Sequence, residues 1–160
     1  MNPAGAKRSA LREDQIQRYA RHILLPDVGG RGQERLLAAA VEVELGAGRA
    51  AEATALAYLA AAGVGRVFLT GDVDGAPGDD EIAGGILYGA GDRERPRGVA
   101  ARERIAALNP DVSVIIEGAA PADALRLADQ LEPGDQDLAG ILARAGAAAA
   151  RVLLAIARRA

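Results

Sequence analysis

Residues 43–54 read VELGAGRAAEAT and carry the clearest indication of the fold class. Alternating apolar and charged residues lead into Gly46 and Gly48, and a run of good helix formers follows them. A strand that passes through a glycine turn into a helix is typical of Rossmann-type folds, whose turn and helix N-terminus hold phosphates. We therefore predict a strand over 41–45 and a helix over 48–62 that ends at Gly63.

Segments with helical and strand-like patterns alternate on both sides of this turn. Upstream, we expect a helix over 11–23, a break at LLPDVGGRGQ, and a short helix over 34–39. Downstream, the patterns predict strands over 64–70 and 112–117, a loop over 71–91, and helices over 99–108, 122–131 and 137–160. This alternation predicts an α/β fold, a Rossmann-like parallel sheet flanked by helices and preceded by an N-terminal helical segment.

Composition limits the class of protein. The 160 residues suit a single domain, which we expect over 11–160 after a disordered tail at 1–10. The net charge of −3 gives no reason to expect nucleic acid, and without cysteine there is neither a thiolate nucleophile nor a Cys-ligated metal. His22 is the single histidine and cannot build a metal site alone. We find no signal-type segment and expect no membrane-spanning run, so a cytoplasmic location without a membrane partner is predicted.

Three segments carry a family resemblance. They are RYARHILLPDVGGRGQERLLAA at 18–39, AYLAAAGVGRV at 57–67 and ARERIAALNPDVSV at 101–114. In this order and spacing they resemble the N-terminal half of the ThiF/MoeB/HesA adenylyltransferases, which are relatives of the ubiquitin-activating enzymes. The resemblance covers residues 12–118 and implies a truncated member that lacks the C-terminal half of the family fold.

The resemblance implies an activity, cofactors and partners. Members of the family bind Mg·ATP on a Rossmann-like sheet and adenylate the C-terminal Gly-Gly of a ubiquitin-like sulfur-carrier protein. They usually work as homodimers. By resemblance, ATP and Mg²⁺ are the cofactors, and the partners are a sulfur-carrier protein and a second subunit, either a copy of this chain or a homologue.

Five residues match nucleotide-binding positions of the family. Gly46 and Gly48 stand at the phosphate turn, and Arg21 matches the arginine that reaches across the dimer to the nucleotide phosphates. Asp72 lies one position beyond the acidic residue that holds the ribose, and Arg97 stands in place of a lysine. The resemblance therefore makes these five residues the candidate cofactor site.

Other family positions are changed. Arg49 and Glu52 alter the phosphate turn, Glu81 and Gly84 replace an ATP-contacting Asn and Arg, and Arg144 falls where the Mg-binding aspartate should be. We identify no catalytic and no metal-ligating residue. The prediction is a degenerate adenylyltransferase with weak or no catalysis. The alternative is a non-catalytic pseudoenzyme that acts as a dimerisation or partner-binding module, and less favoured alternatives are a decaying gene product and a nicotinamide-dependent dehydrogenase.

Three further features leave alternatives open. A central parallel strand is usually apolar on both faces, so Glu42 and Glu44 indicate either an uncovered face or hidden ionic partners. The acidic run 72–81 fits a solvated loop better than a calcium site. Arg158 and Arg159 fit the C-terminal dipole of a helix better than a membrane surface.

Overall fold

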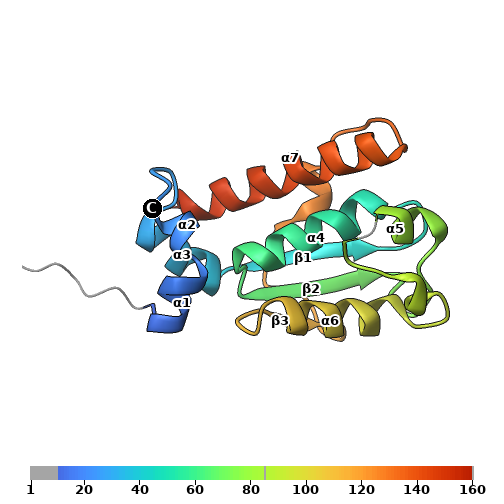
Figure 1. Cartoon of the computed structure of the whole chain (residues 1–160), viewed down its shortest axis with the longest axis horizontal. Coiled ribbons are helices and arrows are strands. Elements are labelled where there is room, and N and C mark those ends of the chain that lie inside the picture. The colour runs from blue at the N-terminus through green and yellow to red at the C-terminus, as the bar shows by residue number, and fades with distance from the viewer. Residues whose placement is uncertain (1–10, 85, 160) are drawn as a thin grey trace, which may run out of the picture.

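The computed structural model describes residues 11–84 and 86–159, so the tail predicted at 1–10 lies outside it. Its centre is a sheet of four parallel strands in the order β3-β2-β1-β4 (Figure 1). The strands are β1 (Ala40–Leu45), β2 (Arg66–Gly71), β3 (Ser113–Ile115) and β4 (Leu125–Arg126). The predicted α/β fold with a Rossmann-like parallel sheet is confirmed.

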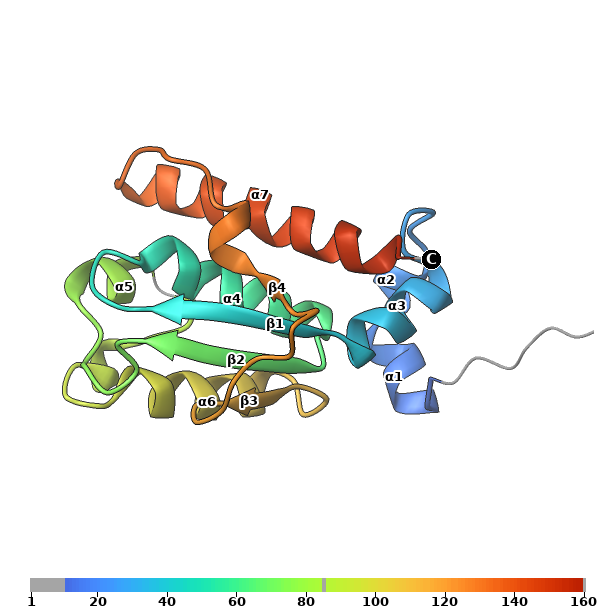
Figure 2. The same cartoon turned by 180° about the vertical axis from the view of Figure 1, so that it is seen from behind.

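The two faces of the sheet are covered differently. Val41, Val43 and Leu45 of β1 point into the main core, which helix α4 (Ala50–Ala62) shares. On the opposite face, the connection from β3 to β4 passes across β1 and β2 (Figure 2). Glu42 and Glu44 lie on this thinly covered face and are half-buried. One of the alternatives left open for these two carboxylates, an uncovered face, is therefore largely correct.

Helix α4 is apolar all round because it is surrounded. It packs against β1, against α6 (Arg97–Leu108), and most extensively against α7 (Leu138–Ala157). A helix that is apolar on every side is stable only when it is buried on every side. It ends as predicted at Gly63, whose φ of 86° is the left-handed C-cap conformation.

Helix α7 corrects one expectation. It is 20 residues long with a mean hydropathy of 1.6, so by length and composition it could cross a membrane. By length and composition alone, the expectation of no membrane-spanning run is wrong for this segment. One side of the helix packs into the main core through Ala145, Ala148, Val152 and Ile156. The fold buries 33% of this apolar stretch, so core packing explains part of its composition.

Other predicted elements differ from the structure. The helix expected over 122–131 is instead β4 and a short 3₁₀ helix, η2 (Leu127–Gln130), because Leu125 and Arg126 pair with the edge of β1. The loop expected over 71–91 contains α5 (Asp79–Gly84) and the 3₁₀ turn η1 (Ala90–Asp92). In the N-terminal part, α3 (Gly29–Ala38) begins five residues before the predicted start at 34. The helix predicted over 11–23 is divided at Tyr19 into α1 (Glu13–Arg18) and α2 (Ala20–Ile23).

Candidate functional site

The glycine turn has the predicted shape. It lies where β1 ends, it is closed by a hydrogen bond of 3.1 Å from the Arg49 amide to the Gly46 carbonyl, and α4 begins at Ala50. Gly48 has a φ of 75°, a conformation that side chains other than glycine rarely adopt. The strand–turn–helix unit expected from residues 43–54 is therefore present.

The arginine of this turn is engaged within the chain. Arg49 donates from Nη2 to Glu44 and from Nη1 to Glu52, each at 2.9 Å. Glu44 comes from β1 and Glu52 from the first turn of α4, so the guanidinium bridges the strand and the helix. Glu42 has a partner too, since its carboxylate lies 3.3 Å from Arg126 Nε. The second alternative for Glu42 and Glu44, that ionic partners exist, is thus also correct.

Asp72 lies directly beside the turn. A Cβ atom placed on Gly46 would be 3.7 Å from the Cβ of Asp72, which follows the end of β2. The Asp72 carboxylate accepts from Arg97 Nη1 at 2.7 Å and from the Gly75 amide at 2.9 Å. Asp72 therefore lies between Gly46 and Arg97, at the end of the sheet where β1 and β2 finish.

Arg97 is held by a buried carboxylate. Its side chain is 4% exposed and that of Glu81 is 0% exposed. Arg97 donates from Nε and Nη2 to the two oxygens of Glu81 over 2.9–3.1 Å, a bidentate arrangement. These hydrogen bonds raise the pKa of Arg97 above its usual range. Burial, with Glu81 nearby, raises the pKa of Tyr88, whose hydroxyl contacts the Arg97 carbonyl.

We call Glu44, Arg49, Glu52, Asp72, Glu81 and Arg97 the turn network. Each of its two arginines is paired with two carboxylates, so the ionised network carries a net charge of −2. A phosphate group is stabilised by surplus positive charge. The side chains around this turn supply a surplus of negative charge instead.

The first turn of α4 is covered as well. Ala50 and Ala51 are buried and form an apolar cluster with Ile141 of α7, against which Leu131 packs. Arg144, which falls where the resemblance expects an Mg-binding aspartate, lies on α7 and donates to Gln136. Within 11–84 and 86–159, no group of three or more His, Asp or Glu side chains could hold a metal ion.

Arg21 does not lie at the end of the sheet that carries the glycine turn. It lies on α2, with α1 and α3, at the end of the molecule where the strands begin, whereas the glycine turn lies where they end (Figure 1). It is exposed, and its guanidinium makes no ion pair within the described part of the chain. Of the five candidate residues, the structure brings together Gly46, Gly48, Asp72 and Arg97, and leaves Arg21 apart.

A second polar cluster joins the three segments that carry the family resemblance. Tyr19, which is buried, accepts from the Asn109 amide at 2.9 Å and donates to Asp111 at 3.0 Å. Gln33 is fully buried and donates to the Ala62 carbonyl at 2.9 Å. We call Tyr19, Gln33, Asn109 and Asp111 the N-terminal latch, because together they fasten α1–α3 to α4 and to the turn that follows α6.

Asp111 is the most heavily bonded member of the latch. Besides Tyr19, it accepts from Arg12, Gln15 and Arg18 at 2.7, 3.1 and 2.5 Å. Burial would raise the pKa of this carboxyl group, but these four hydrogen bonds outweigh burial and lower the pKa to about 2. These residues lie within the three family motifs, but the motifs alone did not predict the latch. The signal was present, since polar residues inside otherwise helical or apolar motifs often have a buried partner.

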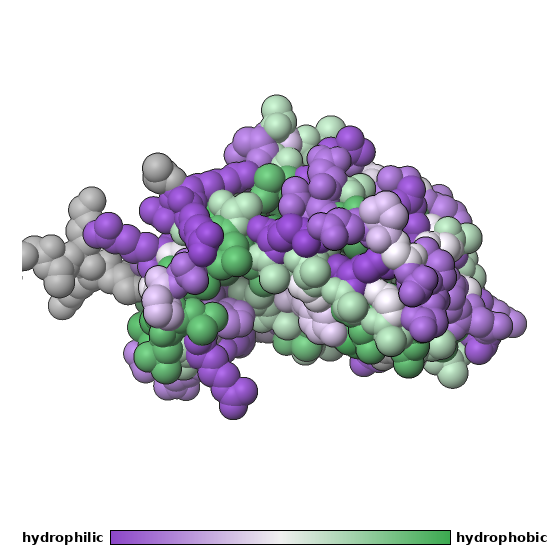
Figure 3. All heavy atoms as spheres, turned by 90° about the horizontal axis from the view of Figure 1, so that it is seen from above, coloured by the Kyte–Doolittle hydropathy of each residue, from purple (hydrophilic) through white to green (hydrophobic). Residues whose placement is uncertain are grey.

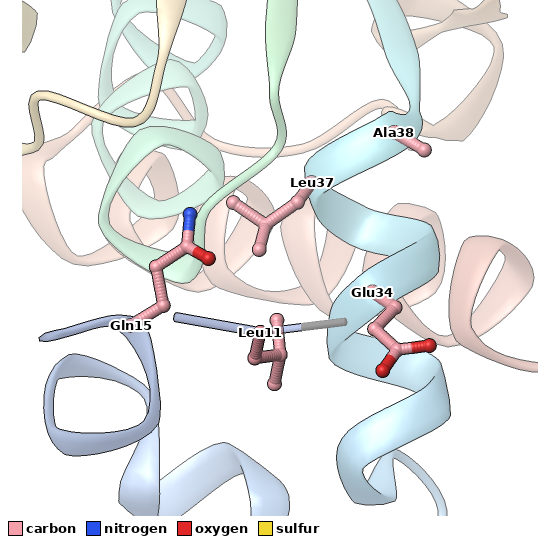
Figure 4. Close-up of a pocket in the computed structure, with 5 residues that line it drawn as sticks. All are labelled: Leu11, Gln15, Glu34, Leu37 and Ala38. Carbon is pink, nitrogen blue, oxygen red and sulfur yellow. The ribbon is translucent and has the colours of Figure 1, made fainter. Parts of the chain in front are cut away.

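An open pocket of about 270 Å³, drawn in Figure 4, lies near the latch, because Gln15 both lines it and donates to Asp111. It lies between α1 and α3 and is lined by Leu11, Gln15, Glu34, Leu37 and Ala38. This pocket is at the opposite end of the sheet from the turn network, so it is not a nucleotide crevice of the Rossmann kind.

Known proteins share both sequence and fold with this chain. MoeZ of Mycobacterium tuberculosis, named as a probable adenylyltransferase/sulfurtransferase, is 39% identical over 126 residues, which are 78% of this chain and 31% of MoeZ. The sulfur carrier protein ThiS adenylyltransferase of Escherichia coli is 35% identical over 119 residues, 71% of this chain and 46% of that enzyme. The chain thus spans less than half the length of these curated relatives. No family model matches it.

Solved structures give the same fold. PaaA superposes with a TM-score of 0.58 and 26% identity over 72% of this chain and 38% of PaaA. E. coli MccB, crystallised with ATP, superposes with a TM-score of 0.51 and 20% identity over 61% of this chain and 29% of MccB. At that identity, the match to MccB concerns the fold alone.

Proposed function

We propose that this chain, which belongs to the ThiF/MoeB-type family of E1-like adenylyltransferases, binds a protein partner and does not catalyse a reaction. The observation that carries this proposal is the turn network. Its two arginines are each paired with two carboxylates of the same chain, at the place where relatives of this fold would hold a nucleotide.

The physical argument concerns charge. Adenylyl transfer depends on positioned cations that stabilise the negative charge of the reacting phosphates, usually with a metal ion. Here the turn network is net negative, and Arg144 stands at the position of the expected metal ligand. A triphosphate approaching this turn would meet repulsion and would have to displace the carboxylates that are paired with Arg49 and Arg97. Catalysis by this arrangement would be weak or absent.

The surface that supports partner binding is the exposed side of α2 and the turn after it. Leu24 is 81% exposed and Leu25 is 50% exposed, and Arg21 lies beside them on α2. Figure 3 shows hydrophobic residues next to strongly hydrophilic ones at this end of the molecule. Exposed apolar side chains rimmed by charge are typical of interaction sites. In our proposal they bind a second copy of this chain, or a homologue, in the cytoplasm.

Calorimetry with Mg·ATP tests the absence of nucleotide chemistry. We expect no binding heat at millimolar nucleotide. Binding in the micromolar range that is weakened by Gly48→Ala would contradict the proposal, and weakening by Arg21→Ala would in addition return Arg21 to the site.

Sedimentation tests the partner surface. We expect self-association, or association with a co-expressed homologue, that is lost in Leu24→Ser/Leu25→Ser. The matched control is Leu108→Ser/Leu138→Ser, which removes two leucines of 48% and 50% exposure from other surfaces. An equal effect of both double variants would show that general apolar exposure, and not this surface, drives the association.

A second candidate function is ATP-dependent activation of a sulfur-carrier protein. The identity of 35% to the ThiS adenylyltransferase of E. coli, and the preserved backbone of Gly48, support it. Pyrophosphate exchange with a purified ubiquitin-like sulfur carrier is its test. Exchange above the rate without carrier would favour this enzyme role over the partner-binding role.

A further inference from the structure

We infer that the outer face of α7 is a docking surface for a helix of another protein, one whose apolar side is flanked by Glu or Asp. This inference goes beyond the proposed function, because it concerns a different surface from that of Leu24 and Leu25 and a partner of defined charge. It starts from the part of α7 that the fold leaves uncovered. Only 33% of the apolar window of this helix is buried, although its mean hydropathy is 1.6.

The uncovered residues follow a coiled-coil pattern. The residues on this side, which we call the α7 seam, are Ala143, Ala147, Ala150 and Leu154. They are separated by four, three and four positions, which is the spacing of a and d positions in a heptad repeat. The three alanines are exposed and the leucine is half-buried, so the seam points away from the core. Beside it, a Cβ atom added to Gly146 would meet nothing within 4 Å, which leaves room for another helix.

A row of arginines borders the α7 seam. Arg144, Arg151 and Arg158 recur every seven residues, each one position after a d position, which makes them e positions of the same repeat. Residues at e positions form ion pairs with a partner helix and determine which partner binds. Helix α7 itself contains no Asp or Glu that neutralises them. Figure 3, which views the molecule from the side of α7, shows strongly hydrophilic groups beside weakly hydrophobic ones.

The carboxylates that these arginines contact are exposed and replaceable. Arg151 lies 3.3 Å from the carboxylate of Glu132, whose side chain is 75% exposed. Arg158 lies 2.8 Å from that of Asp27, which is 63% exposed. The first arginine of the row has no carboxylate partner within the described part of the chain and donates to an amide instead. Because exposed ion pairs contribute little to stability, exchanging these two carboxylates for those of a partner costs little.

The pattern argues against two other occupants. A second copy of α7 would bring the same arginine row, and like charges that meet across an interface repel. An anionic membrane would attract the arginines, but helices that lie in a membrane surface bury Trp, Phe or Leu, and the α7 seam is mostly alanine. Small side chains instead let a partner helix approach closely, since the distance between helix axes depends on the side chains at the contact. A helix with acidic flanks fits both the seam and the row.

The experiment measures the binding of two synthetic helical peptides to the whole chain by calorimetry. Both peptides carry Leu and Ala at the a and d positions, and their e and g positions are all Glu in one and all Lys in the other. We expect the Glu peptide to bind about tenfold more tightly or better, with a smaller difference at high salt. Equal affinities, or no binding of the Glu peptide at about 1 mM, would overturn the inference.

Ala147→Glu tests the seam. It places a long acidic side chain at an exposed position in the middle of the α7 seam, where it meets the glutamates of the peptide. Binding of the Glu peptide should weaken about tenfold or more. The matched control is Ala106→Glu, at an exposed position of α6, which should not change binding. An equal effect of both variants would overturn the assignment to α7.

Arg151→Glu/Arg158→Glu tests the row. Reversing two of its charges should reverse the preference, so that the Lys peptide binds more tightly. The matched control, Arg66→Glu/Arg102→Glu, changes two exposed arginines outside α7 and should keep the preference for the Glu peptide. An equal change in both would overturn the inference, because net charge alone would then explain binding. If the variant of the row does not fold, Ala147→Glu decides, since that side chain is exposed.

Two further outcomes would assign this face to another occupant. Loss of self-association in Ala147→Glu, measured by sedimentation, would show that a second copy covers the α7 seam. Binding of the wild-type chain to vesicles of phosphatidylserine and phosphatidylcholine, abolished in the same variant, would show that a membrane does. Either result would overturn the inference. Neither bears on the nucleotide test of the proposed function, so the two fail separately.

Discussion

The hydroxyl of Tyr19 accepts a hydrogen bond of 2.9 Å from the side-chain amide of Asn109, 90 residues later in the chain. The same hydroxyl donates to Asp111 at 3.0 Å. Replacing Tyr19 by Phe keeps the buried ring but removes both bonds. We expect the free energy of unfolding to fall by about 1–3 kcal/mol, since a buried amide N–H loses its acceptor. Urea denaturation measures this, with Tyr58→Phe as control, because Tyr58 is half-buried and lies outside the latch. A loss equal to that of the control would show that the latch bonds do not stabilise the fold.

Asp111 gives a pH dependence. Its folded pKa of about 2 lies below the ordinary 3.8, so its ionised form stabilises the folded chain above pH 3.8, and this stability is lost as the pH falls toward 2. Asp111→Asn should therefore cost about 2 kcal/mol at pH 7 and progressively less below pH 4. Unfolding curves between pH 2 and 7 give the difference. Asp129→Asn, at an exposed position, is the control and should cost little at any pH. A cost of Asp111→Asn that does not change with pH would contradict this account.

Gly63 has two reasons to be glycine. Its φ is 86°, and a Cβ atom there would lie 2.7 Å from the Tyr19 ring. Gly63→Ala should lower the free energy of unfolding by about 2–4 kcal/mol, through backbone strain and overpacking together. Gly30→Ala is the matched control, because Gly30 lies in α3 with nothing within 4 Å of the added methyl group. That change should be neutral or stabilising by up to about 1 kcal/mol. Thermal unfolding of both variants distinguishes local strain from a general effect of alanine.

The Arg97–Glu81 pair should behave as a unit. Arg97→Met leaves the buried Glu81 carboxylate uncompensated, at an expected cost of about 3–5 kcal/mol. Arg97→Met/Glu81→Leu should recover most of that loss, since two apolar side chains replace two buried charges. Arg93→Met, which breaks the exposed pair with Asp79, should change stability by less than about 1 kcal/mol. Strictly additive losses in a double-mutant cycle would show that the two residues are not coupled.

The sequence predicted the fold where short-range pattern determines structure. The alternating pattern at 41–45 predicted β1. The helix formers up to Ala62 predicted α4, and the glycine at 63 predicted its C-cap. The structure confirms all three. It failed where distant partners override local preference. Leu125 and Arg126 have neighbours suited to a helix, yet they pair with β1 as a strand because that edge is open.

The candidate site shows the same limit. The residues Gly46, Gly48, Asp72 and Arg97 were found from their places in the motifs, and four of the five predicted residues do meet. The sequence did not reveal that Glu44 and Glu52 would close on Arg49. Ion pairing of this kind depends on the direction of each side chain at the end of β1, which spacing alone does not determine.

The separation between Tyr19 and its partners has a consequence for synthesis on the ribosome. At about 5–20 residues per second, Asn109 follows Tyr19 by roughly 5–18 seconds. During that interval α1–α3 have been made, but Asn109 and Asp111, the partners of Tyr19, have not. Nascent chains of this protein would therefore carry an undocked N-terminal segment, with Leu24 and Leu25 accessible to chaperones, until more than two thirds of the sequence has been made.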